Sequence, residues 1–74
     1  MSSITIIISN MMGRRQTLMV FTSDTISRGK QLYGDGNAQW KADGEILKDD
    51  RKFGDYGIED GDTIVSNDRT RGGN

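Results

Sequence analysis

The first third of the chain predicts a β-hairpin, and this feature most constrains the fold. Residues 4–8 form a β-branched run that ends in polar residues and Gly13. Branched side chains favour extended backbone, and glycine adopts the positive φ that a tight loop needs. Residues 15–21 follow with Leu18 and Val20 on one face, since side chains alternate along a strand. The rest of the chain must therefore cover one apolar face of an antiparallel hairpin.

The next segment predicts one short helix. The run Ser23-Asp24-Thr25 precedes Ile26, and short oxygen-bearing side chains accept hydrogen bonds from the free amides at a helix start. The apolar helix positions are Ile26, Leu32 and Tyr33, and the glycine-rich residues 34–37 end the pattern. An interior glycine, Gly29, weakens the helix by about 1 kcal/mol relative to alanine.

A second pair of strands is expected after the helix. Residues 38–42 surround Trp40, and the Asp43-Gly44 pair predicts a type I′ turn into residues 45–47. Polar residues 48–52 then predict a surface loop. After it come three apolar residues spaced to bury one side of a single irregular turn, namely Phe53, Tyr56 and Ile58.

The end of the chain predicts a last strand and a tail. Residues 63–65 are suited to a strand, whereas every residue from 66 onward is polar or glycine and has nothing to bury. Two strands before the helix and further strands after it indicate an α+β fold rather than a wound parallel sheet. We expect one domain over residues 1–66 and a flexible tail over residues 67–74.

Composition excludes several classes of function. The 74 residues include no cysteine and no histidine, so the chain lacks thiolate ligands and the commonest general base and metal ligand. We expect no enzyme activity, no cofactor and no metal site. The net charge of −1 comes from interspersed basic and acidic residues, so the sequence shows no cluster of positive charge that would bind nucleic acid or an anionic membrane. The longest apolar run is too short for a signal peptide or membrane span. We expect a cytoplasmic or nuclear monomer.

The residues at these positions resemble the ubiquitin family in two gapless blocks. The first block covers Gly13, Thr17, Leu18, Val20 and the run from Ser23 to Ile26. The second begins near Trp40 and includes Gly44, Leu47, Asp49, Arg51, Asp55, Tyr56, Ile58, Thr63, Arg69, Arg71, Gly72 and Gly73. The resemblance implies a β-grasp fold, in which a mixed sheet of four to five strands packs on one short helix.

The sequence departs from the family between the two blocks and at two core positions. About half a dozen residues are missing where the family has the end of its helix and a proline-containing loop, which implies a shorter helix. Gly29 and Ser66 stand where the family places aliphatic core residues. We therefore expect a thinner core and lower stability.

The resemblance also implies a role for the tail. In the family, the last glycine is adenylated, passed between enzyme cysteines as a thioester and joined to a lysine. Gly73 would be the conjugated residue and Gly72 its thin neighbour, while Arg69 and Arg71 would be read by activating and deconjugating enzymes. A peptidase would first remove Asn74. The implied partners are activating and conjugating enzymes, a processing or deconjugating peptidase and target proteins.

The positions that form the recognition surface in the family differ here. They hold Met11, Lys41 and Asn67, which cannot offer the same apolar contact, and Met12 adds a second adaptable thioether at the hairpin tip. Standard ubiquitin receptors should therefore bind poorly. The two positions that most often carry chains hold Glu45 and Asp60, so Lys30 is the candidate chain acceptor at a family position.

Two other functions remain open at this point. One is a sulfur carrier of the same fold, in which Gly73 becomes a thiocarboxylate. The other is an interaction module that is never conjugated. Trp40 is predicted to be structural, and the acidic pairs near Asp49 and Asp60 are predicted to be solvated turns, because their spacing matches no calcium loop.

Overall fold

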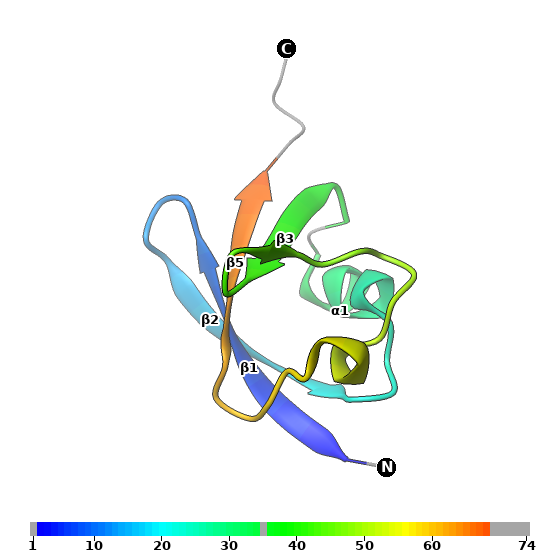
Figure 1. Cartoon of the computed structure of the whole chain (residues 1–74). Helices are drawn as coiled ribbons and strands as arrows, with labels where there is room; N and C mark the ends of the chain where they lie inside the picture. The colour runs from blue at the N-terminus through cyan, green and yellow to red at the C-terminus, as the bar shows by residue number, and fades with distance from the viewer. Residues whose placement is uncertain (1, 35, 69–74) are drawn as a thin grey trace.

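The computed structural model describes residues 2–34 and 36–68, which form one mixed sheet folded around a short helix (Figure 1). The sheet has five strands in the order β2-β1-β5-β3-β4. The elements in chain order are β1 (Ser3–Asn10), β2 (Arg15–Phe21), α1 (Ile26–Tyr33), β3 (Ala38–Ala42), β4 (Glu45–Ile46), the 3-10 helix η1 (Phe53–Tyr56) and β5 (Thr63–Asp68). This arrangement confirms the predicted α+β, β-grasp fold.

The first hairpin forms as the sequence predicted. Strands β1 and β2 pair antiparallel, and alternation buries Ile4, Ile6 and Ile8 on the face toward α1. The Asn10 side chain closes the loop, since its Oδ1 accepts hydrogen bonds from the backbone N–H groups of Met12 (2.9 Å) and Arg14 (3.0 Å). The hairpin therefore supplies one apolar face and a turn whose backbone is fixed by Asn10.

Helix α1 begins and ends at the predicted caps. Thr25 Oγ1 accepts from the backbone N–H of Arg28 at 3.1 Å, and Gly34 at the other end has φ +86° and donates to the Lys30 carbonyl at 2.8 Å. The helix is short, as the missing residues implied. Of the apolar helix positions, Ile26 is fully buried, whereas Leu32 is 50% exposed.

Strand β5 lies between β1 and β3 and joins the two halves of the sheet. It runs parallel to β1 and antiparallel to β3. The prediction that this strand ends at residue 65 is wrong, because Ser66 is buried opposite Trp40 and pairing continues to Asp68 opposite Ala38. A polar sequence can thus hold a strand where a neighbour supplies the hydrogen bonds. The expected domain boundary after residue 66 falls inside β5.

The second half of the fold follows the predicted turns. Asp43 and Gly44 both have positive φ, at 53° and 78°, as a type I′ turn requires, and the turn leads into the two-residue strand β4. Phe53 at the start of η1 is fully buried, and Ile58 lies in the core beyond it. The irregular turn therefore buries one side, as its apolar spacing predicted, and its Phe53 ring lies against the helix at Gly29.

Two aromatic side chains fill the space beside Gly29, where the helix carries no side chain. Trp40 and Phe53 are both fully buried, and they face the helix backbone at Gly29. A Cβ placed on Gly29 would lie 2.6 Å from Phe53 Cζ and 3.4 Å from Trp40 Cζ3. At Gly29 the helix backbone therefore lies close to two aromatic rings, which leave no room for a side chain.

This contact predicts that Gly29→Ala destabilises the protein, although alanine is the better helix former. The buried Phe53 ring has no solvent to move into, so overpacking should lower the free energy of unfolding by about 1–3 kcal/mol, measured by urea denaturation. The control is the same change in a Phe53→Leu background, where the smaller side chain should reduce the penalty. If Gly29→Ala alone made the protein more stable than the parent, the prediction would be wrong.

Candidate protein-binding surface

The residues predicted to act in conjugation lie outside the described residues. They are Arg69, Arg71, Gly72, Gly73 and Asn74. The described chain ends in β5 at Asp68, beside the tip of the first hairpin, because Asn10 at the end of β1 pairs in parallel with Ser66 (Figure 1). The candidate tail thus continues from the central strand of the sheet at the hairpin-tip end.

The hairpin tip carries the two most exposed large apolar side chains described. Met11 is 72% exposed and Met12 is 90% exposed. Their backbone is held by the Asn10 side chain, so the thioethers project from a fixed loop. Flexible, polarizable side chains on a fixed loop suit contact with partners of varied shape.

Lys41 and Asn67, also predicted for this surface, share the sheet face that points away from α1. Their strand neighbours Trp40 and Ser66 are buried, so alternation directs Lys41 and Asn67 outward. We call this side of β3, β4 and β5 the exposed sheet face. The structure therefore brings together the predicted surface residues of the two strands and places the methionines at the same end.

Two apolar residues of the exposed sheet face were missed by sequence reasoning. Val65 of β5 and Ile46 of β4 both pair directly with Lys41, one on each side, and both are exposed. Neighbouring strands carry side chains on one face about 4.5–5.5 Å apart, so a cation stands between two apolar groups. Val65 could have been found from the sequence, because it follows Ile64 and must point the opposite way.

This arrangement determines which partners the face suits. The aliphatic stem of Lys41 can lie along Val65 and Ile46 while its ammonium group reaches outward. A purely apolar partner helix would have to strip water from that ammonium group, which costs free energy unless the partner supplies an anion. The face therefore favours partners that carry a carboxylate beside apolar residues.

Lys30, the candidate chain acceptor, is buried in an ion pair. Its side chain is 7% exposed, and its Nζ lies 2.6 Å from Asp49 Oδ1, while the Asp49 side chain remains 59% exposed. An amine held this way is shielded from an incoming thioester. The pair instead ties α1 to the loop after β4. Whether Lys30 accepts a chain stays a prediction.

The other lysines are more open. Lys41 is half-buried on the sheet, whereas Lys48 and Lys52 are exposed on the loop between β4 and η1. Glu45 and Asp60, which the resemblance places where the family has its usual chain lysines, carry carboxylates and cannot act as amine nucleophiles. An acceptor amine on the described part of the chain is thus most accessible on the loop of residues 48–52.

Trp40 and the acidic residues have structural roles. Trp40 is fully buried and contacts the Tyr33 ring edge-on, with centroids 6.0 Å apart. Asp60 Oδ1 accepts from the Thr5 backbone N–H at 2.7 Å, and Asp62 Oδ2 accepts from the Glu59 N–H at 2.8 Å, so both carboxylates close the turn before β5. Within residues 2–34 and 36–68, no group of three or more acidic side chains could hold a metal ion.

Comparisons with known proteins agree with this architecture. The model of the ubiquitin family matches residues 6–71. This range begins within β1, includes every later element of the fold and extends three residues beyond the end of β5 at Asp68. A search of curated proteins found no match. Within the described part of the chain, no helix has the length and hydrophobicity needed to cross a bilayer.

The Lys30–Asp49 pair predicts an order of amine reactivity. An amine-reactive ester at neutral pH should modify Lys48 and Lys52 well before Lys30, because burial and the carboxylate protect the Lys30 amine. Peptide mapping by mass spectrometry at short reaction times measures the order. In urea all three lysines should react alike, and Asp49→Ala should raise the reactivity of Lys30. Early labelling of Lys30 in the folded parent would show that its amine is available.

Proposed function

The chain belongs to the ubiquitin family, and on this premise we propose that it is a protein modifier joined to target lysines through Gly73 after a peptidase removes Asn74. The observation that carries the proposal is the position of the Arg69–Gly73 motif. The family match runs from residue 6 within β1 to residue 71, so Gly72 and Gly73 follow the matched range directly. A diglycine at any other distance from β5 would carry far less weight.

The proposed chemistry requires only a reachable carboxylate on this chain. The Gly73 carboxylate attacks the α-phosphorus of ATP and releases pyrophosphate, and an enzyme thiolate then displaces AMP to form a thioester. The amine of a target lysine attacks the thioester carbonyl, loses a proton and releases the thiol, which leaves an isopeptide bond. Residues without Cβ atoms at Gly72 and Gly73 allow a narrow enzyme channel to close around the chain.

The partners that this proposal requires are activating and conjugating enzymes, a peptidase and target proteins, and we place them with the chain in the cytoplasm or nucleus. Arg69 and Arg71 would bind carboxylates of the activating enzyme through paired guanidinium hydrogen bonds. The exposed sheet face would select receptors, and the Lys41 cation between Val65 and Ile46 disfavours receptors that present only apolar surface. The protein would therefore be conjugated as other members of the family are, but would be bound by different receptor proteins.

A thioester assay tests the proposal. The chain ending at Gly73 is incubated with a ubiquitin-activating enzyme and ATP, and we expect a thiol-sensitive band on a non-reducing gel. The chain that keeps Asn74 is the matched control and should give no band, because its glycine carboxylate is blocked. Gly73→Ala in the shortened chain should reduce the band strongly, because the added methyl group meets the channel.

The other outcomes separate the alternatives. Mass spectrometry of the chain purified from cells should detect loss of Asn74 and remnants of the tail on target lysines. A mass gain equal to replacing one oxygen of Gly73 by sulfur would support a sulfur carrier and overturn the proposal. Finding only the intact chain in cells, with Gly73→Ala fully functional, would leave an unconjugated interaction module.

A further inference from the structure

Three methionines lie within the described residues, and none of them belongs to the core. Met11 and Met12, in the turn between β1 and β2, are 72% and 90% exposed, and Met19 on β2 is 66% exposed. Only 32% of the chain is apolar, so a flexible apolar side chain would be useful inside the protein. These thioethers remain at the surface instead, where their chemistry is open to dissolved reagents.

The fold of the turn does not depend on the two thioethers at the hairpin tip. The Asn10 N–H donates to the Arg14 carbonyl at 2.9 Å, and the Gly13 N–H donates to the Asn10 carbonyl at 3.0 Å. The Asn10 side chain holds the amides of Met12 and Arg14, and Gly13 adopts a φ of +81°. All these contacts use backbone atoms or the Asn10 side chain, so a chemical change at either sulfur leaves them in place.

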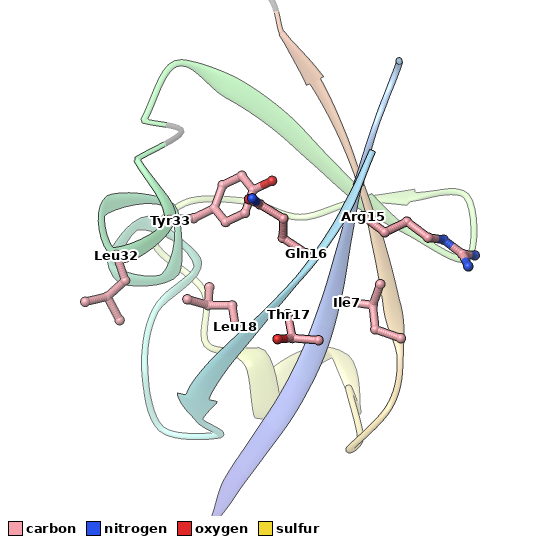
Figure 2. A pocket seen from close by; sticks show the side chains of 7 residues that line it. All are labelled: Ile7, Arg15, Gln16, Thr17, Leu18, Leu32 and Tyr33. Atoms are coloured by element: carbon pink, nitrogen blue, oxygen red, sulfur yellow. The ribbon is translucent and has the colours of Figure 1, made fainter. Parts of the chain in front are cut away.

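Met19 stands in a more crowded setting. Figure 2 shows that Leu18 points toward α1 whereas Arg15 extends to the opposite side, and alternation places Met19 on the same side as Arg15. There it lies directly opposite Thr5 of β1, with Phe21 two residues along its own strand. Met11 and Met12 lie where β1 has ended and β2 has not begun. They should therefore react with a dissolved oxidant before Met19 does.

An open hollow beside the turn brings a cation close to Met12. It has a volume of about 480 Å³ and is lined by Asn10, Met12, Gly13 and Arg14. A thioether is a weak hydrogen-bond acceptor, whereas oxidation to the sulfoxide makes the side chain polar, and arginine has five N–H donors. The Arg14 guanidinium can therefore donate to an oxidised Met12, so the turn accommodates both oxidation states.

We propose that Met11 and Met12 form a reversible oxidation site, at which hydrogen peroxide converts the two thioethers to sulfoxides and makes the hairpin tip polar. The tip lies at one end of the exposed sheet face, so oxidation withdraws the apolar contact that this end offers to a partner. The site uses no residue of the tail. It goes beyond the proposed conjugation and does not depend on it.

The chemistry transfers one oxygen atom and two electrons at each sulfur. The sulfur lone pair attacks one oxygen of hydrogen peroxide and the O–O bond breaks. The proton on the transferred oxygen passes to the departing hydroxide, which leaves as water. A methionine sulfoxide reductase reverses the change, since two thiols become one disulfide and the sulfoxide oxygen leaves as water. Such an enzyme must reach the sulfur, and the exposure of the tip allows this.

Peroxide treatment of the full chain tests the order of reaction. Trypsin cuts after Arg14 and so separates Met19 from the other methionines, and fragment masses assign each oxygen among Met1, Met11 and Met12. We expect Met12 and then Met11 to gain one oxygen each before half of Met19 is modified. In urea these three should react at similar rates, because unfolding exposes every sulfur alike.

A second measurement distinguishes a reversible switch from damage. The protein oxidised at Met11 and Met12 should keep the urea midpoint and the dispersed NMR spectrum of the parent, because neither side chain is buried. It should also elute earlier from a hydrophobic-interaction column. Methionine sulfoxide reductases of both epimer specificities should act on the folded protein and restore the mass and the retention time of the parent.

Matched variants assign the change to the hairpin tip. Met11→Leu combined with Met12→Leu keeps the tip apolar, since leucine and methionine have similar volumes, but removes both sulfurs. At a peroxide dose that oxidises the tip of the parent, this variant should lose most of the retention shift. Met19→Leu removes a sulfur outside the site and should leave the shift of the parent intact.

Three results would overturn the proposal. Uptake of the first oxygen by Met19 would show that the tip thioethers are protected. A lowered urea midpoint after oxidation of Met11 and Met12 alone would show that these sulfurs support the fold, so that oxidation is damage. Failure of the reductases on the folded protein, while they reduce its tryptic peptide, would show that the site is not reversible.

Discussion

The arrangement depends on the contact between the backbone of α1 at Gly29 and the ring of Phe53. Because a helix without a side chain at that point can approach η1 closely, Trp40 and Phe53 can both be fully buried beneath it. Two large aromatic residues bury more apolar area than the aliphatic residue that Gly29 replaces. A chain of 74 residues with a short helix thus obtains a packed core by moving bulk from the helix to the sheet and the 3-10 turn.

Residues close together in the sequence were sufficient to predict most of the fold. The predictions failed where pairing with a residue distant in the sequence determines the structure. The hairpin, the Thr25 and Gly34 caps and the Asp43-Gly44 turn each follow from residues close in sequence. The length of β5 does not, because Ser66 is buried by its pairing with β3 and not by its own hydrophobicity. Leu32 shows the converse, since this apolar helix residue stays half-exposed where no element covers it.

The candidate surface was predictable only in part. The family positions indicated Met11, Lys41 and Asn67, but strand register is needed to see that Val65 and Ile46 stand on either side of Lys41. Sequence alone also could not reveal that Lys30 meets Asp49, because the two residues lie on separate elements. Both features depend on long-range pairing, which carries no local pattern. The order of strands and the register therefore determine the chemical character of the site more than composition does.

The strand order also relates the proposed point of attachment to the exposed sheet face. The last described residue, Asp68, ends β5, which lies between β1 and β3 and contributes Val65 and Asn67 to that face. In the proposed conjugation the bond forms at Gly73, five residues after Asp68, so it uses no group of β3, β4 or β5. A copy joined to its target through Gly73 would therefore keep Lys41, Val65 and Ile46 available to a receptor protein.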